Sequence, residues 1–450
     1  MARRRFLWLA ATAALALVGA LGVIGASAAP PAEADASAVI QWNAIAASTL
    51  TGLPQPAGGA APSSQVNMGM VQGAVYDAVN AITPKHHRPY LLTRRFGSTA
   101  SEEAAVGTAA YLVLKNIIET VPQSIAFPTR ASVLAALDAQ YTASQNAVAD
   151  SRFKEMGVAA GTAAAEAMLA ARQGDGRFGA SQWVPNSAPG HWDPVAPNGT
   201  TVQDPTPWVG GVKPFLIQSS SQFRGAGPPA LTSAAWAADF NEVKAIGGDG
   251  IVTPSTRTST QTYVARWWQS NPAASWNEVA RQLIARNGLS APDAAWVLAL
   301  ENLAAADAAI STWNDKYHFD FWRPFQAIRR AALDDNPATA PDPTWTPLIS
   351  APYPDNPSGH LGLDSSHTTV LRMFFGDAPA GGYQITSSFV NPGGPAVRSF
   401  TSFSQTVGEV IEARIWAGLH YRTADLQAVQ LGTHVANYAA ANYFEPVGNH

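Results

Sequence analysis

Residues 292–324 read PDAAWVLALENLAAADAAISTWNDKYHFDFWRP, and this stretch decides the fold class. Alanine and leucine dominate it, and its apolar residues recur at the 3.6-residue spacing of an α-helix. We predict one long helix over residues 292–330. Similar Ala-rich patterns predict helices before and after it, whereas alternating β-branched runs are scarce and no hairpin pair is indicated. The sequence therefore predicts an all-α protein built from helical bundles with long irregular loops.

Two irregular stretches interrupt the helical pattern, at residues 173–229 and 334–357, and both are rich in proline. Loops of this length are usually functional or packed over a neighbouring element. The chain divides accordingly into four parts. We expect a signal peptide (1–28), a linker (29–38), an N-terminal helical region with a long loop (39–229) and a C-terminal helical bundle that carries the functional site (230–450).

The N-terminus has the pattern of an export signal. Three arginines at residues 3–5 precede an apolar run over residues 6–24, and the small residues Ala26, Ser27 and Ala28 follow. The arginines loosely fit a twin-arginine signal. An uncleaved membrane anchor is the alternative. We expect no later stretch to span a bilayer, so the mature protein is predicted to be secreted and not membrane-embedded.

Composition excludes several functional classes. The 450-residue chain has a net charge of −4 and 13% charged residues, which argues against a nucleic-acid-binding protein. It has no cysteine, which excludes disulfides, thiolate metal sites and cysteine nucleophiles. Any anion site must therefore be a local concentration of positive charge.

The first chemically suggestive segment places cations among aromatic residues. Lys316 and Arg323 are seven residues apart, so two helical turns would bring both to one face, about 10 Å apart along the axis. Trp313, Phe319 and Trp322 lie beside them in the sequence. Buried cations are costly unless an anion compensates them. A solvated charged face is the ordinary interpretation of such a pair, and the aromatic setting argues against it.

The second segment, residues 354–360, is typical of a helix start. Ser358 suits the N-cap position, and Gly359 permits close approach of the backbone. The free N–H groups and positive dipole of a helix N-terminus bind anions. His360 in the first turn would face such an anion and is placed for proton transfer. A plain capped helix with an incidental histidine is the alternative.

The third segment covers residues 413–425. Arg414 and His420 are six residues apart, which is about 120° around a straight helix, so they would not share a face. We predict a break near Gly418, with His420 beginning the next element, that lets the two converge. Asp425 is then a candidate to orient His420 or to support its charge.

In order, the segments have the pattern Lys-x6-Arg-Pro, Pro-Ser-Gly-His and Arg-x5-His. This pattern resembles the superfamily that joins vanadium-dependent haloperoxidases with type 2 phosphatidic acid phosphatases and bacterial acid phosphatases. Residues 306–324 and 76–82 further resemble its soluble bacterial haloperoxidase branch. Two departures from the phosphatase pattern also favour the haloperoxidase branch. Asp425 follows His420 by five residues instead of four, and alanine instead of serine precedes the third-segment arginine.

The resemblance implies a role for each matching residue. It makes His420 the apical vanadium ligand, or the phosphate-accepting nucleophile of a phosphatase, and His360 the acid–base group. It implies vanadate as cofactor, with hydrogen peroxide and a halide as substrates. The oxygens of vanadate or phosphate would be bound by Lys316, Arg323, Ser358, Gly359 and Arg414, and a halide pocket would include Trp313 and Tyr353.

Other functions remain open on the sequence alone. Vanadate mimics the transition state of phosphoryl transfer, so the same residues suit an acid phosphatase that hydrolyses phosphomonoesters through a phosphohistidine, without a cofactor. A divalent-metal hydrolase would instead use His360, Asp364 and His367 on one helix face. A non-catalytic oxyanion-binding helical protein is the third alternative. In each case the predicted partners are small molecules, and a homo-oligomer is compatible with the sequence.

Overall fold

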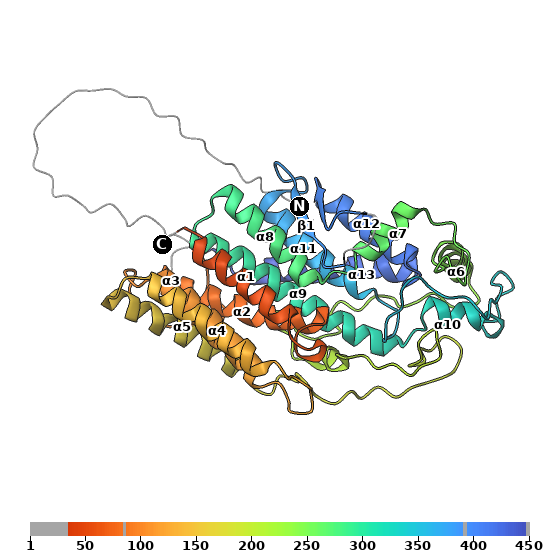
Figure 1. Ribbon diagram of the computed structural model, residues 1–450, viewed down its shortest axis with the longest axis horizontal. Coiled ribbons are helices and arrows are strands. Elements are labelled where there is room, and N and C mark those ends of the chain that lie inside the picture. Colours follow the sequence, from red (N-terminus) through yellow and green to blue (C-terminus); the bar gives the residue numbers. More distant parts are fainter. Residues whose placement is uncertain (1–34, 84–86, 390–393, 447–450) are drawn as a thin grey trace, which may run out of the picture. The chain divides into compact units, whose positions relative to one another are not determined.

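The computed structural model describes residues 35–83, 87–389 and 394–446, and these residues are mostly helical (Figure 1). The predicted all-α fold is confirmed. The predicted signal peptide (1–28) and most of the predicted linker (29–34) lie outside the described residues. The described elements are α1 (Ser37–Thr51), α2 (Ala61–Ile82), α3 (Glu102–Glu119), α4 (Arg130–Ala147), α5 (Arg152–Ala171), α6 (Ala234–Ile246), α7 (Ser259–Trp267), α8 (Pro272–Asn287), α9 (Ala291–Phe319), α10 (Pro324–Arg329), α11 (Gly359–Phe375), α12 (Phe403–Trp416) and α13 (Arg422–Asn442), with the short 3-10 turns η1 (Gln55–Ala57), η2 (Pro207–Gly211) and η3 (Ala331–Leu333) and the strands β1 (Tyr383–Thr386) and β2 (Val397–Phe400).

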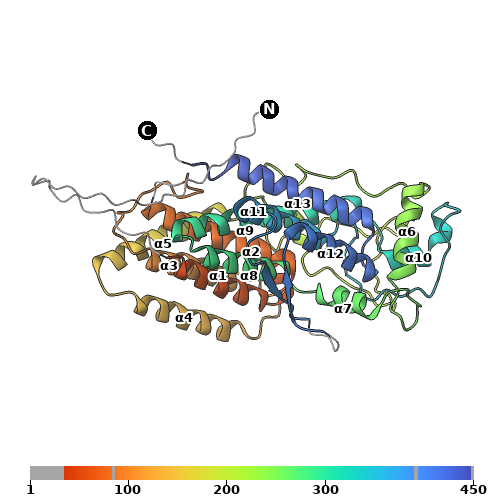
Figure 2. The same ribbon diagram turned by 90° about the horizontal axis from the view of Figure 1, so that it is seen from above.

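Helix α9 is the central element of the core. It packs against α2 from the N-terminal region and against α11 and α13 from the C-terminal region, and both views place it between them (Figures 1 and 2). Small residues allow this close packing. A Cβ atom added at Gly69 of α2 would lie 3.0 Å from the Cβ of Ala306, and one at Gly362 of α11 would lie within 2.3 Å of the Thr312 hydroxyl. The Ala-rich composition that predicted the helix is therefore also what lets its neighbours approach.

Helix α9 corrects one expectation about membrane spans. Among the described residues it is long and apolar enough to cross a bilayer by length and composition, whereas we expected no such stretch after the N-terminus. Its most apolar window is 94% buried inside the protein. A helix that is covered by other helices on all sides is apolar all round, so a core helix passes the same test.

The predicted helix over residues 292–330 is in fact two helices. Asp320, with φ 51°, ends α9 in the left-handed conformation, and Arg323 is the N-cap of α10 in an extended conformation. Pro324 explains the break, because a proline disfavours the α conformation of the residue before it. Lys316 and Arg323 therefore do not lie on one helix, and their approach depends on the turn between α9 and α10.

A second correction concerns the region after α11. We predicted no hairpin, but β1 and β2 form an antiparallel pair in which Tyr383 lies opposite Phe400. The strands have four residues each, too few to give a strong alternating pattern. Helix α12 follows, with the Ser402 side chain accepting from the backbone N–H of Gln405 at 3.4 Å.

The long loop over residues 173–229 packs across α9. The carboxylate of Asp307 on α9 accepts the backbone N–H groups of Phe215, Leu216 and Ile217 at 2.6, 2.6 and 2.9 Å. On α2, Asp77 accepts three consecutive N–H groups of residues 90–92 in the same way. Each buried carboxylate thus fixes one irregular segment onto a core helix.

Candidate oxyanion site

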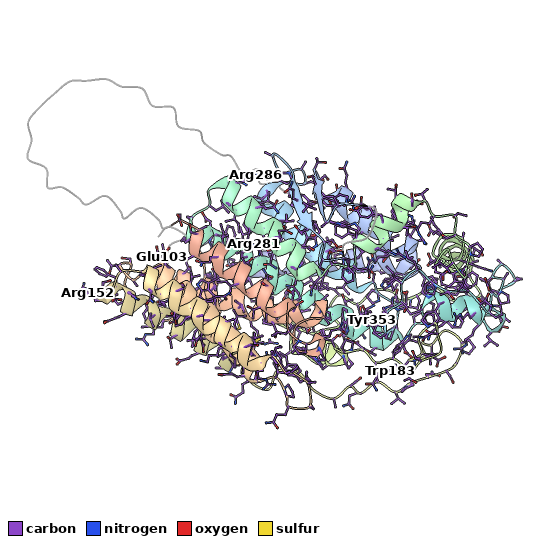
Figure 3. The ribbon with its side chains drawn as sticks, viewed as in Figure 1. Glu103, Arg152, Trp183, Arg281, Arg286 and Tyr353 are labelled. Atoms are coloured by element: carbon purple, nitrogen blue, oxygen red, sulfur yellow. The ribbon has the colours of Figure 1, made fainter. Side chains whose placement is uncertain are left out.

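The three predicted segments meet in one buried region. Lys316 lies in the last turn of α9, and Arg323 lies at the start of α10. Ser358 is the N-cap of α11, as predicted, and Arg414 lies in the last turn of α12. The side chains of all four residues, and that of His420, are at most 3% exposed. The loop residue Tyr353, labelled in Figure 3, lies among them.

Lys316 ties the first segment to the second. Its ammonium Nζ donates to the carbonyl oxygens of Pro354, Asp355 and Pro357 at 3.1, 3.0 and 2.6 Å. These contacts use all three donors of the ammonium group. Burial, followed by repulsion from Arg323, holds the pKa of Lys316 well below its usual value. Lys316 therefore anchors the loop before α11 while adding positive charge to the region.

Arg323 connects the loop before α11 to the third segment. Its Nε donates to the carbonyl of Tyr353 at 2.7 Å, and its Nη1 donates to the carbonyl of Leu419 at 2.8 Å. The same Nη1 lies 3.3 Å from Nε2 of His420. The remaining nitrogen, Nη2, has no hydrogen-bond partner among the described residues.

The predicted break near Gly418 is confirmed. Helix α12 ends at Trp416, Gly418 has φ +68°, and α13 begins at Arg422, so His420 lies in the connection. A Cβ atom at Gly418 would lie 2.4 Å from the carbonyl oxygen of Gly247. Both the positive φ and the close approach require glycine here. The turn brings His420 back toward the first and second segments.

The buried groups without hydrogen-bond partners in the described part of the chain include one donor from each segment: Nη2 of Arg323, Oγ of Ser358 and Nε of Arg414. Buried polar groups are almost always hydrogen-bonded, so donors left without partners in a folded protein need an explanation. Two cationic donors and a hydroxyl beside a helix N-terminus match the acceptors of a tetrahedral oxyanion. The residues present therefore fit vanadate or phosphate.

Gly359 lies where the first and second segments touch. A Cβ atom at this position would lie 2.9 Å from the ring carbon Cη2 of Trp313 and 3.5 Å from Cε of Lys316. Any side chain would displace Trp313 or enter the space beside the lysine. The absence of a side chain also leaves the backbone N–H at the first position of α11 open to a ligand.

His420 is held between opposite charges. Its Nδ1 lies 2.8 Å from Oδ1 of Asp355, a carboxylate that is fully buried. Burial, then Arg323, Lys316, Arg414 and His360, hold the pKa of His420 well below its usual value. We had considered Asp425 for this supporting role. The structure instead places Asp355 against the ring, while Asp425 lies near the Ser358 hydroxyl without an aligned hydrogen bond to it, and burial holds the pKa of Asp425 well above its usual value.

His360 lies in the first turn of α11 and reaches a cavity of about 500 Å³. Arg414, Trp313, Tyr353 and Leu419 also line this cavity. Burial and then Arg414 hold the pKa of His360 well below its usual value. Its Nε2 lies 3.7 Å from Oδ2 of Asp364, whose other oxygen accepts the indole N–H of Trp276 at 2.7 Å.

The two residues predicted for a halide pocket are neighbours in the cavity wall. The rings of Trp313 and Tyr353 have centroids 5.3 Å apart, and the Lys316 ammonium lies within 6 Å of both rings. The indole N–H of Trp313 donates to Asp204 at 3.0 Å, which fixes the ring. A larger cavity of about 600 Å³ lies on another side of Trp313. It is lined by Arg224, whose Nε and Nη2 donate to Asp315 and Asn314.

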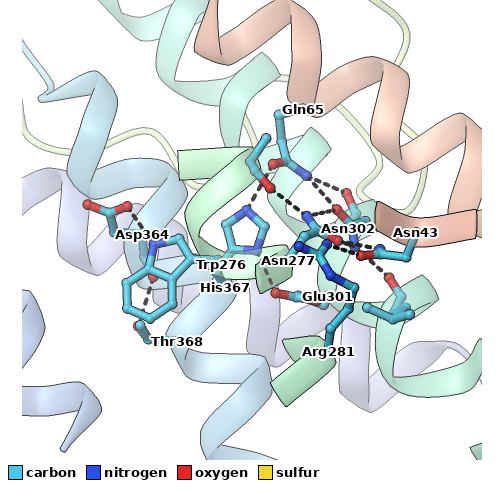
Figure 4. A network of polar contacts seen from close by, with 12 residues as sticks. Asn43, Gln65, Trp276, Asn277, Arg281, Glu301, Asn302, Asp364, His367 and Thr368 are labelled. Carbon is cyan, nitrogen blue, oxygen red and sulfur yellow. Dashed lines mark hydrogen bonds and ion pairs between the residues drawn. The ribbon is translucent and has the colours of Figure 1, made fainter. Parts of the chain in front are cut away.

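The metal-hydrolase alternative does not fit the position of His367. Its Nδ1 lies 3.0 Å from Glu301 and its Nε2 lies 2.8 Å from the side-chain oxygen of Gln65, inside a buried polar network (Figure 4). Both ring nitrogens are thus engaged away from His360. In the described ranges no group of three or more His, Cys, Asp or Glu residues is arranged to hold a metal ion.

Sequence reasoning missed Asp355 and considered Asp364 only as a ligand of a divalent-metal hydrolase. Both are fully buried carboxylates that contact a site histidine. Asp364 follows His360 by four residues on a helix, a spacing that signals a shared face. Asp355 offered no comparable signal, because its approach to His420 joins residues that are 65 positions apart in the chain.

Two sequence comparisons relate the chain to known proteins. Residues 296–448 match the family model of the VCPO second helical-bundle domain. The chain is 26% identical over 218 residues to the vanadium chloroperoxidase of Curvularia inaequalis; the match covers 41% of this chain and 35% of the length of that relative. The predicted resemblance to vanadium-dependent haloperoxidases is confirmed.

Solved structures show the same fold. A structure described as the first bacterial vanadium-dependent iodoperoxidase superposes with a TM-score of 0.72 at 21% identity and covers 94% of this chain and 100% of its own. A holo-type bacterial vanadium-dependent chloroperoxidase superposes with a TM-score of 0.67 at 17% identity, covering 92% of this chain and 98% of its own. At these identities the likeness establishes the fold of the chain.

Proposed function

We propose that this chain, whose residues 296–448 match the second helical bundle of the vanadium chloroperoxidases, is a vanadate-dependent haloperoxidase that oxidises a halide with hydrogen peroxide. The observation that carries the proposal is the set of three partnerless buried donors on Arg323, Arg414 and Ser358. An oxyanion would satisfy all three at once. The family comparisons favour vanadate over phosphate as that oxyanion.

In this proposal, His420 is the protein ligand to vanadium, and Arg323 and Arg414 neutralise the negative charge on the oxygens. Ser358 donates its hydroxyl and Gly359 donates its backbone N–H. Lys316 adds charge from behind the loop whose carbonyls it binds. Bound vanadate supplies a Lewis acid that activates peroxide without a change in the oxidation state of the metal.

His360 is proposed as the acid–base group, because it is the site histidine that lines the cavity. The overall reaction, H2O2 + X⁻ + H⁺ → HOX + H2O, consumes one proton, which His360 is placed to deliver. The depressed pKa of this histidine suits a group that takes up and releases a proton instead of staying charged. Asp364 lies 3.7 Å from the ring and, in its ionised form, would support the protonated histidine.

Trp313 and Tyr353 are proposed as the wall that the halide meets. Both rings lie near the Lys316 ammonium, so a halide against them would be close to a buried positive charge. Aromatic edges carry partial positive charge and tolerate an anion that has lost part of its water.

One assay pair tests the function. The purified protein is dialysed with orthovanadate and supplied with peroxide and bromide, and halogenation of a phenol dye is followed; hydrolysis of p-nitrophenyl phosphate is measured in parallel without vanadate. We expect vanadate-dependent halogenation that is lost in His420→Ala and retained in His434→Ala, an exposed histidine on α13. Hydrolysis without halogenation would make the chain a phosphatase that uses the same residues. Vanadate binding with neither activity would make it an oxyanion-binding protein.

We further propose that the chain is exported and acts on small molecules outside the cytoplasm. The support is the arginine-led apolar N-terminus followed by small residues. Expression of the full chain in a bacterium, followed by N-terminal sequencing of exported protein, tests this. A new N-terminus near Ala28 is expected, and full-length protein retained in the cell membrane would contradict it.

A further inference from the structure

Asp355 connects all three segments of the site. Its backbone N–H donates to the carbonyl of Phe321 at 2.8 Å, and its backbone carbonyl accepts from Lys316 at 3.0 Å. Its side chain reaches the third segment, with Oδ1 lying 2.8 Å from Nδ1 of His420. The same oxygen lies 3.7 Å from Nη1 of Arg323. With both backbone groups held by the first segment, the carboxylate has a fixed position.

The two nitrogens of His420 face groups of opposite character. On one side, Nε2 faces the Arg323 guanidinium at 3.3 Å, and a guanidinium can only donate. On the other side, Nδ1 faces the carboxylate of Asp355, which in its ionised form can only accept. The first contact requires a lone pair on Nε2, and the nearby negative charge of the second favours a proton on Nδ1. Both neighbours therefore select the same neutral tautomer.

The contact with Asp355 is close but not aligned as a hydrogen bond. By distance it is an ion-pair contact, and by angle neither Nδ1 nor the carboxylate oxygens have a hydrogen-bond partner among the described residues. Burial disfavours the charged form of this carboxylate, and Arg323, Lys316 and the backbone N–H of Tyr421 offset part of that cost. The protein thus holds a carboxyl group against the His420 ring in a position that burial alone makes unfavourable.

We propose that Asp355 is a positioning residue that fixes the ring and tautomer of His420, so that Nε2 presents its lone pair to the oxyanion. The catalytic consequence rests on the proposed function, whereas the tautomer does not. A histidine that binds a metal is usually oriented by a carboxylate or carbonyl at its other nitrogen, and loss of that partner weakens binding by about 10- to 100-fold. In this chain the partner comes from the second segment, because Asp425 of the third segment faces Ser358.

Nuclear magnetic resonance of the vanadate-free protein, labelled with ¹⁵N at histidine, tests the proposal at pH 8. The His420 signals are assigned by their loss in His420→Gln. In the unaltered protein we expect a protonated Nδ1 and an unprotonated Nε2. In Asp355→Leu we expect this pattern to be lost, and in Asp355→Asn, which keeps an acceptor oxygen, we expect it to be partly retained. Asp425→Asn is the matched control, because it removes a buried carboxylate of the same region and should leave the His420 tautomer unchanged.

Vanadate affinity, measured by calorimetric titration, gives a second readout. We expect Asp355→Leu to bind orthovanadate about 10- to 100-fold more weakly than the unaltered protein, with Asp355→Asn between the two. A protonated Nε2 in the unaltered protein would overturn the proposal, as would equal effects of Asp355→Asn and Asp425→Asn on the tautomer. The first of these results needs no variant of Asp355, so it stands even if those variants do not fold. Absence of halogenation together with the expected tautomer would refute the proposed function alone.

Discussion

Nη1 of Arg323 lies 3.3 Å from Nε2 of His420, although the two residues are 97 positions apart in the chain. A fully buried guanidinium this close to a buried imidazole is unfavourable if the imidazole is protonated, and it accounts for part of the depressed pKa of His420. The guanidinium therefore disfavours protonation of His420, and its Nη2 has no hydrogen-bond partner among the described residues.

Arg323→Gln is expected to weaken orthovanadate binding by about 10- to 100-fold, because a charge-assisted bond contributes about 1.5–3 kcal/mol. Arg323→Lys should restore the charge but not the affinity, since Nε and Nη1 of the arginine also hold the carbonyls of Tyr353 and Leu419. Calorimetric titration measures both. Arg286→Gln serves as control: this α8 arginine, labelled in Figure 3, binds the carbonyl of Ala380 and should leave vanadate affinity unchanged. Equal affinity of Arg323→Gln and the unaltered protein would remove Arg323 from the site.

Oxyanions are expected to stabilise the protein. Lys316, Arg323 and Arg414 are all buried and repel one another, so an anion that binds only the folded state raises the free energy of unfolding. At a phosphate concentration 100 times the dissociation constant the gain is about 2.7 kcal/mol. Thermal unfolding with and without phosphate, at constant ionic strength set with chloride, measures it.

The stabilisation should disappear in Arg414→Gln, whose Nε is one of the three partnerless donors. Phosphate that stabilises this variant as much as the unaltered protein would show that the anion binds elsewhere.

Asp364→Asn is expected to be more stable than the unaltered protein, by a margin that grows as the pH rises. Burial raises the pKa of Asp364 from 3.8 to about 7, against the smaller effects of Trp276 and Arg414. The folded state thus binds a proton more tightly than the unfolded state, and the protein loses stability as the pH rises from about 4 to about 7. Asparagine does not titrate and still accepts the indole N–H bond of Trp276. The variant should gain on the order of 2–4 kcal/mol over the unaltered protein at pH 8, and much less at pH 5.

Urea unfolding at pH 5 and pH 8 measures this difference. Asp138→Asn on α4 is the control, because its pKa is lowered by the Tyr111 hydroxyl, so its replacement gives no gain that grows with pH. A pH-independent effect of Asp364→Asn would mean that Asp364 stays ionised in the folded protein.

The sequence was sufficient for the parts of the site that depend on local spacing. The N-cap at Ser358 and the break at Gly418 follow from residue types whose backbone preferences are strong, and the structure has both. The prediction that Lys316 and Arg323 share one helix face was wrong. It gave more weight to the helical period of residues 292–330 than to the local effect of Pro324. The turn at Asp320 brings the two residues into the site by another route.

The parts that were missed depend on tertiary contacts. Asp355 stands in an irregular loop, and nothing in the spacing of that loop indicates that it meets His420. His367 shows the converse: it shares a helix with His360, but Glu301 of α9 and Gln65 of α2 engage both of its nitrogens in the core (Figure 4). Local periodicity predicts which face of a helix a residue occupies, and it does not predict which neighbour covers that face.

The turn at Gly418 allows the position of His420 to be tested by a substitution outside the oxyanion-binding residues. Gly418→Ala places a side chain on a backbone with φ +68° and brings its Cβ to 2.4 Å from the carbonyl oxygen of Gly247, so the connection must shift. Because His420 is two residues away, the shift should reach its ring. We expect a loss of more than about 1–2 kcal/mol in unfolding free energy, the cost of a left-handed alanine alone, together with markedly weaker orthovanadate binding.

Gly288→Ala is the control that introduces backbone strain without a steric clash. Gly288 ends α8 with φ +60°, and a Cβ atom there meets nothing within 4 Å, so alanine carries the backbone cost without a clash. This variant should lose about 1–2 kcal/mol in urea unfolding and keep its vanadate affinity. If Gly418→Ala lost no more stability than Gly288→Ala and bound vanadate equally well, the turn would not set the position of His420. A larger loss in both measurements, confined to Gly418→Ala, is the result that the close contact with Gly247 predicts.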